Sequence, residues 1–189
     1  MRNPVNPPEG RSSWKMLLVD RDGLLIENHP YLADPSEVIV IQGVFEALSD
    51  ARKAGLRIAV ITNQSGIGRG LVSWNEVHAV NQQIDDLLGP FDSWCICPHL
   101  PDGNCECRKP LPGMIVKAAA MLGIPISSCL MAGDRFSDIQ AAQRAGVDNA
   151  LIPSNDTPDL EIALAPRVFP SLGNLVKWMT SGSVGNLCE

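Results

Sequence analysis

Short apolar runs alternate with helical patterns along this chain. The apolar runs predict buried parallel strands at residues 16–19, 56–61, 94–97, 129–132 and 150–152, with a possible sixth strand at 167–169. Polar residues follow several of these runs: Asp20 comes directly after the first and Thr62 directly after the second. The pattern therefore places reactive side chains at the carboxyl ends of predicted strands.

Apolar residues spaced three and four apart predict helices between the strands. Most of these patterns end just before a glycine, which readily takes the left-handed conformation that closes a helix. The predicted helices span residues 44–51, 77–87, 115–122, 139–145 and 172–179. Ser73 and Glu76 have the spacing of a capping box in front of the second helix.

The alternation of strands and helices predicts an α/β fold, a doubly wound parallel sheet with helices on both faces. Ligands of such sheets bind beyond the carboxyl ends of the strands. A chain of 189 residues can build one sizeable core, so we predict a single domain over residues 15–189 with no large cap domain. Residues 1–14 are rich in Pro, Asn and Gly, and we expect them to form a flexible N-terminal arm.

Charge and hydropathy narrow the functional classes. The net charge of −6 disfavours binding to nucleic acid or to an anionic membrane. The chain contains neither a signal peptide pattern nor a run of about 18 apolar residues. We therefore expect a cytoplasmic monomer that acts on a small metabolite.

Four of the six cysteines and one histidine gather in a short segment. Cys97 and His99 form one closely spaced pair, and Cys105 and Cys107 form another. This pattern favours a tetrahedral zinc site over disulfides, and residues 97–107 are interpreted as a zinc loop. Buried thiols are the alternative, and Cys95 is a possible substitute ligand.

The residues that follow the predicted strands match the inventory of a magnesium-assisted phosphoryl-transfer site. These residues are Asp20, Asp22, Thr62, Asn63, Asp134, Arg135 and Asp138, together with Arg108 and Lys109 after the zinc loop. A carboxylate can attack phosphorus and form an aspartyl-phosphate, and Asp20 is the candidate nucleophile. Asp22, two residues on, is the candidate general acid and base.

The remaining groups have roles that follow from charge. Asp20, Asp134 and the backbone carbonyl of Asp22 would hold Mg²⁺, which offsets the repulsion between carboxylates and phosphate. Thr62 and Lys109 would contact the phosphoryl oxygens, and Asp138 would orient Lys109 or a metal-bound water. Taken alone, the segment 20–23 could equally be a solvated turn, and a zinc-stabilised binding module without catalysis is the alternative of another class.

These motifs in this order resemble the haloacid dehalogenase superfamily of phosphatases. The set comprises Asp20-x-Asp22-Gly, Thr62-Asn-Gln-Ser, Lys109 and Gly133-Asp134-x₃-Asp138. The resemblance implies a Rossmann-like core, magnesium dependence and loops in place of a large cap. The zinc loop is similar to that of the branch containing heptose-1,7-bisphosphate 7-phosphatases and histidinol-phosphate phosphatases, which implies a structural zinc on Cys97, His99, Cys105 and Cys107.

Different segments of this chain resemble the two kinds of enzyme in that branch. Segments 62–70 and 109–114 and the loop 28–31 resemble the heptose enzymes, whereas segments 97–101 and 133–135 resemble the histidinol enzymes. The resemblance implies removal of one phosphate from a sugar bisphosphate, with histidinol phosphate as the alternative substrate. The substrate-binding candidates are Asn28, His29, Tyr31, Asn63, Gln64, Ser65, Arg69, Arg108 and Arg135.

Overall fold

The computed structural model describes residues 14–181. Residues 1–13 of the expected arm and the last eight residues, with Cys188, lie outside the described residues. Trp14, which was assigned to the arm, is buried. Its indole Nε1 donates a hydrogen bond to Asp148 (3.0 Å) and its ring lies 4.9 Å from that of Trp178. Trp14 is therefore part of the folded core.

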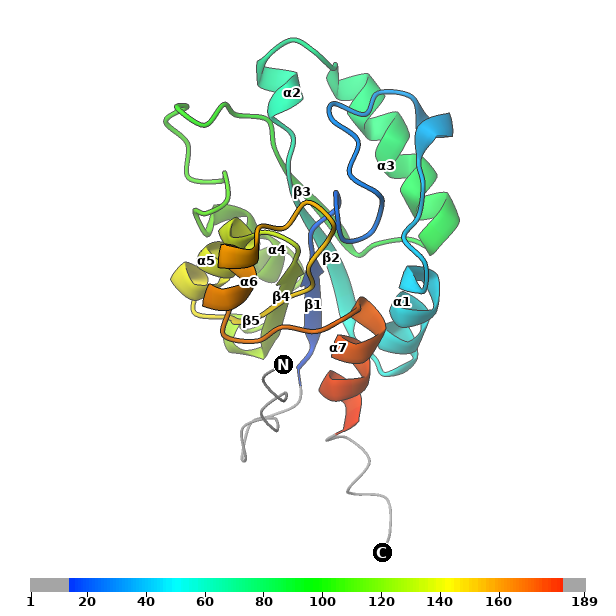
Figure 1. The fold of residues 1–189 in the computed structure, drawn as a ribbon, viewed down its shortest axis with the longest axis vertical. Coiled ribbons are helices and arrows are strands. Elements are labelled where there is room, and N and C mark those ends of the chain that lie inside the picture. Colours follow the sequence, from blue (N-terminus) through cyan, green and yellow to red (C-terminus); the bar gives the residue numbers. More distant parts are fainter. Residues whose placement is uncertain (1–13, 182–189) are drawn as a thin grey trace, which may run out of the picture.

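A five-stranded parallel sheet forms the centre of the molecule (Figure 1). Its strands are β1 (Met16–Val19), β2 (Arg57–Asn63), β3 (Ser93–Cys97), β4 (Cys129–Gly133) and β5 (Asp148–Leu151), in the order β3-β2-β1-β4-β5. The predicted doubly wound sheet is confirmed. The possible sixth strand is not: Val168 forms only an isolated bridge with Leu151, too short to extend the sheet.

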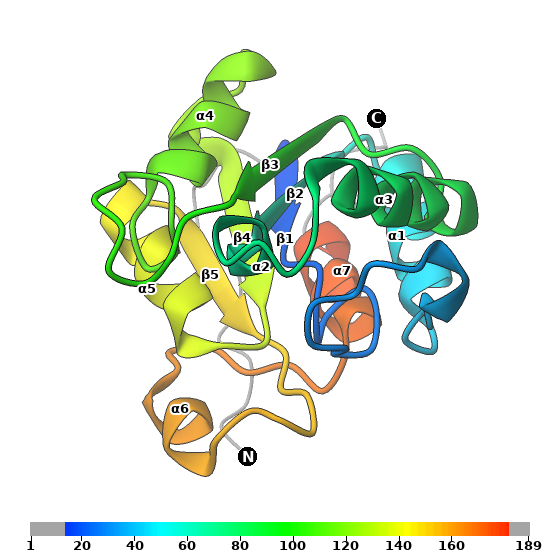
Figure 2. The ribbon, with the colours of Figure 1, turned by 90° about the horizontal axis from the view of Figure 1, so that it is seen from above.

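Helices cover both faces of the sheet (Figure 2). One face carries α1 (Val44–Lys53), α3 (Trp74–Leu88) and α7 (Leu172–Thr180), and the other carries α4 (Gly113–Met121) and α5 (Phe136–Ala145). The strands alternate accordingly: Leu17 and Val19 pack in the first core, and Met16 and Leu18 in the second. Because both faces are buried, strand β1 is apolar throughout.

Several short elements were not anticipated from the sequence. They are α2 (Ser65–Gly68), α6 (Asp159–Leu164) and the 3₁₀ turns η1 (Pro35–Glu37) and η2 (Ile126–Ser128). Their apolar periodicity is too brief to distinguish from loop. The predicted capping box is confirmed, since Ser73 and Glu76 bond reciprocally at the start of α3.

The strand order reverses its direction next to β1. The chain builds outward from β1 through β2 to β3, then crosses back to place β4 on the other side of β1. The loops after β1 and β4 therefore diverge at this point, which is where a crevice forms in open α/β sheets. Within residues 14–181, no helix is both long and apolar enough to cross a membrane.

Candidate active site

Three carboxylates meet at the crevice beside β1. Asp20 follows β1, Asp134 follows β4, and Asp138 lies in the first turn of α5; one oxygen of each lies within 4.8 Å of the others. Glycines leave room for them. A Cβ on Gly23 would clash with Asp134, and a Cβ on Gly133 would clash with Asp138. The close approach of backbone and carboxylate thus requires glycine at both positions.

Lys109 neutralises part of this charge. Its Nζ lies 2.8 Å from Asp20 Oδ1 and 2.6 Å from Asp138 Oδ1, and it donates to the carbonyl of Ile61 at 2.8 Å. Asn63, the last residue of β2, pairs with the Lys109 backbone through two hydrogen bonds of 3.1 Å. Lys109 is therefore fixed at its backbone and at its ammonium group, which lies opposite Asp20.

Burial dominates the electrostatics of these groups. Burial raises the pKa of Asp20 to about 7, although the positive charge of Lys109 opposes this shift. Burial and the nearby carboxylate of Asp20 together raise the pKa of Asp134 to about 6. Burial likewise raises the pKa of Asp138. Burial alone would lower the pKa of Lys109, but the carboxylates of Asp138 and Asp20 outweigh it and hold this pKa above its usual value. The site has an excess of buried negative charge that one lysine does not balance.

Asp134 has the geometry of a cation ligand. Its Oδ2 accepts a hydrogen bond from Ser154 Oγ at 2.8 Å, and its backbone carbonyl accepts one from Thr157 Oγ1 at 2.7 Å. Its Oδ1 is buried and has no hydrogen-bond donor among residues 14–181. An orphaned buried carboxylate oxygen beside Asp20 suits a hard divalent cation such as Mg²⁺. Ser154 and Thr157 escaped sequence analysis because the loop after β5 carries no recognisable motif.

Asp22 belongs to a second set of contacts in the same crevice. Gln64 Nε2 donates to Asp22 Oδ2 and to Thr62 Oγ1, both at 2.8 Å. The Arg21 guanidinium is buried and holds the other side of Asp22, with Nη2 3.0 Å from Oδ1. Arg21 was missed from the sequence, because an arginine between two acids in a turn is expected to point into solvent.

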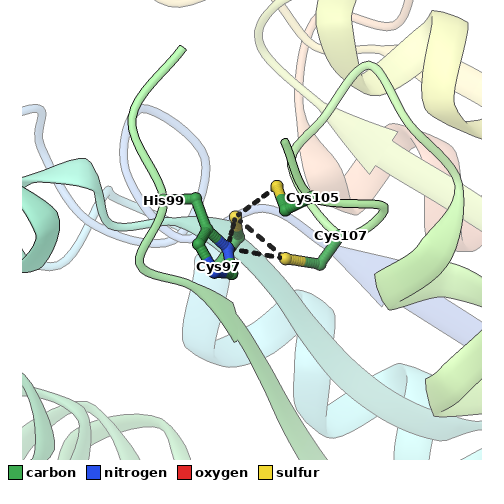
Figure 3. A group of neighbouring side chains, drawn as sticks. All are labelled: Cys97, His99, Cys105 and Cys107. Carbon is green, nitrogen blue, oxygen red and sulfur yellow. Dashed lines mark hydrogen bonds between the residues drawn. The ribbon is translucent and has the colours of Figure 1, made fainter. Parts of the chain in front are cut away.

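Figure 3 shows the four residues of the zinc loop with their side chains directed at one another. Cys97 Sγ lies 3.5 Å from His99 Nδ1, 4.0 Å from Cys105 Sγ and 3.1 Å from Cys107 Sγ, and His99 Nδ1 lies 3.1 Å from Cys107 Sγ. A zinc ion bound at its usual distances separates its ligand atoms by about 3.3–3.8 Å. The donor set therefore fits a tetrahedral zinc site.

The thiols differ in their environment. Burial raises the pKa of the Cys97 thiol to about 12. Desolvation would also raise the pKa of the Cys105 thiol, but hydrogen bonds, first among them that from the backbone N–H of Arg108, outweigh it and lower this pKa. Metal binding to such a site must therefore release protons. Cys95, the possible substitute ligand, is buried on β3 in the core against α4 and is not part of the cluster.

A cavity of about 270 Å³ opens in front of Asp20. It brings together most of the sequence-predicted site residues, namely Asp20, Asp22, Asn28, His29, Tyr31, Thr62, Asn63, Gln64, Ser65, Lys109, Asp134 and Arg135. Arg69 and Arg108 do not line it. Arg69 is exposed beyond the end of α2, and Arg108 Nη1 donates to the carbonyl of His99 at 3.0 Å, which directs it toward the zinc loop.

Helix α2 separates the loop 28–31 from the zinc loop. A Cβ on Gly66 would lie 2.8 Å from Tyr31 Cδ1, and a Cβ on Gly68 would lie 2.6 Å from the Pro98 carbonyl. Tyr31 itself has a φ of 57°, which is unusual for a bulky residue. Gly66 and Gly68 therefore serve close packing, because they lie in a helical turn held between two loops.

Comparison with known proteins agrees with this arrangement. A sequence model of the haloacid dehalogenase-like hydrolases matches residues 21–146. The D-glycero-beta-D-manno-heptose-1,7-bisphosphate 7-phosphatase of Yersinia pestis is 33% identical over 174 residues, which cover 85% of this chain and 93% of that protein. The enzyme of the same name from Escherichia coli K12 is 34% identical over 173 residues, covering 84% and 90%.

A solved structure shows the same fold. The D,D-heptose 1,7-bisphosphate phosphatase from B. bronchiseptica, complexed with magnesium and phosphate, superimposes with a TM-score of 0.81 and 28% identity. The match covers 89% of this chain and 99% of that one. The similarity therefore covers most of the chain.

Proposed function

This chain belongs to the haloacid dehalogenase-like hydrolase family, and from that premise we propose that it is a Mg²⁺-dependent phosphatase that removes the 7-phosphate of a heptose 1,7-bisphosphate. The observation that carries the proposal is the pairing of the buried Asp20 carboxylate with Lys109 at the base of a cavity that also holds Asp22 and Thr62. The names of the relatives at 33% and 34% identity support the substrate.

In the first half of the reaction, an Asp20 oxygen bonds to phosphorus while the bond from phosphorus to the sugar oxygen breaks. Asp22 gives its proton to the departing alkoxide. Lys109 and the Thr62 hydroxyl stabilise the negative charge on the phosphoryl oxygens. Asp138 and the Ile61 carbonyl hold the Lys109 ammonium group beside Asp20, so its charge is in place before the reaction, and the donor that faces Asp20 turns to a phosphoryl oxygen.

In the second half, Asp22 takes a proton from water, whose oxygen bonds to phosphorus as the bond to Asp20 breaks. Asp20, Asp134 and the backbone carbonyl of Asp22 are the proposed ligands of Mg²⁺, which when bound neutralises the carboxylates and polarises the phosphoryl group. The orphaned Oδ1 of Asp134 and the buried excess of negative charge support this assignment.

A bisphosphate needs a second cationic contact besides Lys109. Arg135 and His29 lie on the cavity wall, and the Arg135 guanidinium is half exposed, with Nη1 donating to the carbonyl of Asp156 at 3.2 Å. Histidinol phosphate would instead need a carboxylate for its ammonium group. Glu27 and Glu106 are both absent from the lining of the site, and Glu27 lines a neighbouring cavity, so these two acids do not favour that substrate.

The zinc loop and the setting of the enzyme complete the proposal. We assign a structural Zn²⁺ to Cys97, His99, Cys105 and Cys107, where it would hold the segment leading into Lys109. Thiolate ligation without disulfides suits the cytoplasm. One chain supplies every residue named in the reaction, so a monomer suffices.

The test is a substrate panel assayed with zinc-loaded protein and Mg²⁺. The α and β anomers of heptose 1,7-bisphosphate, fructose 1,6-bisphosphate and histidinol phosphate are compared by phosphate release. We expect kcat/KM for a heptose bisphosphate to exceed that for histidinol phosphate by at least about 100-fold, as a second charge-assisted contact provides, and to exceed that for fructose 1,6-bisphosphate as well. Equal and slow release from all four would refute the substrate, and full turnover by an Asp20→Asn variant would refute the mechanism.

A further inference from the structure

Arg21 is the most completely buried charged side chain of the crevice outside the carboxylate cluster. The residue is 1% exposed and lies between Asp20 and Asp22. Its guanidinium faces Asp22 as a fork: Nε lies 3.2 and 3.1 Å from the two carboxylate oxygens and Nη2 lies 3.0 Å from Oδ1. A planar guanidinium bonded in this way fixes both the position and the plane of a carboxylate.

The other side of the guanidinium is anchored on helix α3. Nη1 donates to Asn81 Oδ1 at 3.1 Å, and Asn81 is itself buried. The Arg21 backbone is fixed as well, because its N–H donates to Asp20 Oδ1 at 2.7 Å and its carbonyl accepts from Leu25 and Ile26. Arg21 is therefore immobilised at its backbone and at its head group.

Stability alone does not account for such an arrangement. Removing a guanidinium and a carboxylate from water costs several kcal/mol per ion, and an apolar pair of similar volume is often as stable or more so. Asp22, by contrast, remains partly exposed and lines the cavity in front of Asp20. The buried partner thus serves the orientation of a group that faces the substrate.

The neighbours of Asp22 hold its carboxylate from two sides. Both Asp22 oxygens accept hydrogen bonds, from Arg21 on one side and from Gln64 Nε2 on the other. Arg21 and Gln64 are thus donors on two sides of Asp22, and together they fix where its two oxygens lie in the cavity.

We propose that Arg21, anchored by Asn81, is a positioning residue that holds the Asp22 carboxylate in the orientation in which it takes a proton from water. In that step the water oxygen bonds to phosphorus, the bond from phosphorus to Asp20 breaks, the proton passes to Asp22 and phosphate leaves. The inference rests on the proposed phosphatase activity. With a leaving group that needs no proton, it predicts that Arg21 matters for hydrolysis of the intermediate and not for its formation.

The experiment uses p-nitrophenyl phosphate, whose leaving group departs without a proton donor. The Arg21→Lys variant keeps the positive charge but loses the forked contact with Asp22. The zinc- and magnesium-loaded variant is mixed rapidly with this substrate, and release of nitrophenolate is followed. We expect a burst of about one nitrophenolate per active site, followed by steady turnover about 100-fold slower than that of the unaltered enzyme, as displacement of a catalytic group by about 1 Å produces. Loss of the burst in proportion to turnover would overturn the proposal.

A double-mutant cycle separates positioning from a general structural role. In an Asp22→Asn background, Arg21→Lys is expected to slow turnover by less than about two-fold, because the group it positions is already removed. A loss as large as in the single variant would show that Arg21 acts elsewhere. An active Asp20→Asn enzyme would instead refute the phosphatase mechanism. An inactive Asp20→Asn enzyme, together with unchanged turnover in the Arg21→Lys variant, would refute only this inference.

A milder variant covers the case in which Arg21→Lys does not fold. Asn81→Ala removes the anchor and leaves the Arg21–Asp22 contact in place, and we expect it to slow steady turnover by about five-fold, as loss of one hydrogen bond does, with the burst retained. Asn149→Ala is the matched control, since Asn149 is also a buried asparagine but lies on β5 outside the cavity lining. Equal effects of the two variants would overturn the proposal.

Discussion

The floor and the rim of the cavity are built differently. The floor consists of Asp20, Asp134, Asp138 and Lys109, all of them buried and joined by contacts of 2.6–2.8 Å or by close approach at the strand ends. The rim consists of side chains on loops, such as His29, Tyr31 and Arg135, which are exposed or half exposed. Charge is concentrated and fixed in the floor, and dispersed and adaptable at the rim.

This difference separates chemistry from recognition. Groups that stabilise a transition state must be in place before the reaction, and a buried network on a rigid sheet achieves this. Groups that select a substrate need only reach it, and they can change without disturbing the sheet. The fold therefore predicts phosphoryl chemistry more firmly than it predicts the sugar, and changes to the floor should affect the enzyme more than changes to the rim.

The largest effect is expected for Lys109→Met, which removes the cation of the floor. Two buried carboxylates lose their partner, so unfolding free energy should fall by about 3–5 kcal/mol and kcat by about 10³-fold or more. Urea unfolding and phosphate release measure these quantities. Lys117→Met, at an exposed position of α4, is the matched control and should change neither. A stable and active Lys109→Met enzyme would show that the floor does not depend on this ion pair.

Loss of zinc tests whether the loop supports the floor from a distance. Cys107→Ala should lower zinc content and reduce kcat by about 10- to 100-fold with magnesium present, because the segment leading to Lys109 loses its anchor. Metal analysis and turnover are measured on the same preparation. Cys95→Ala removes a buried thiol that is not in the cluster and should retain zinc and activity. Full turnover in the zinc-free variant would separate the loop from the floor.

Arg135→Ala tests recognition at the rim. We expect KM for a heptose bisphosphate to rise by about 10- to 100-fold with kcat nearly unchanged, since a charge-assisted contact of about 1.5–3 kcal/mol is lost. KM for the corresponding monophosphate should change much less. Arg69→Ala, an exposed arginine outside the cavity lining, is the control. Equal changes for both variants would remove Arg135 from its assigned role.

The smallest effect is expected where α2 touches the rim. Gly66→Ala places a methyl group 2.8 Å from Tyr31 Cδ1, so the ring must move and KM should rise about two- to five-fold, while kcat stays within about two-fold. Steady-state kinetics and thermal unfolding check this expectation. Gly173→Ala on α7 meets only Ser171 Oγ at 3.6 Å and should leave KM unchanged. If kcat of Gly66→Ala fell more than KM rose, Tyr31 would belong with the catalytic residues of the floor rather than with the rim.

Much of the fold followed from sequence patterns, and the exceptions are instructive. The five principal strands and the helices that end near Gly55, Gly89, Gly123 and Gly146 were predicted, because long periodic segments with a terminal glycine are distinctive. The short helix α2 and the single bridge at Val168 were not, because brief segments take their conformation from their neighbours. For the site, most residues predicted at the crevice line one cavity, but Arg69, Arg108 and the fully buried Asp138 do not.

The sequence by itself predicted which residues gather at the floor and in the Cys/His cluster. Parallel strands bring their carboxyl ends to one edge, so acids placed after β1 and β4 lie on that edge, and the strand order makes these two strands neighbours. Two closely spaced pairs of Cys and His in one loop also lie near each other in the structure. Only the tertiary structure decided which arginine side chains face the cavity and which residues they contact. Arg21 is buried on Asn81, 60 residues away, and Ser154 bonds Asp134, 20 residues away, because packing of distant segments sets the directions of long side chains and loops.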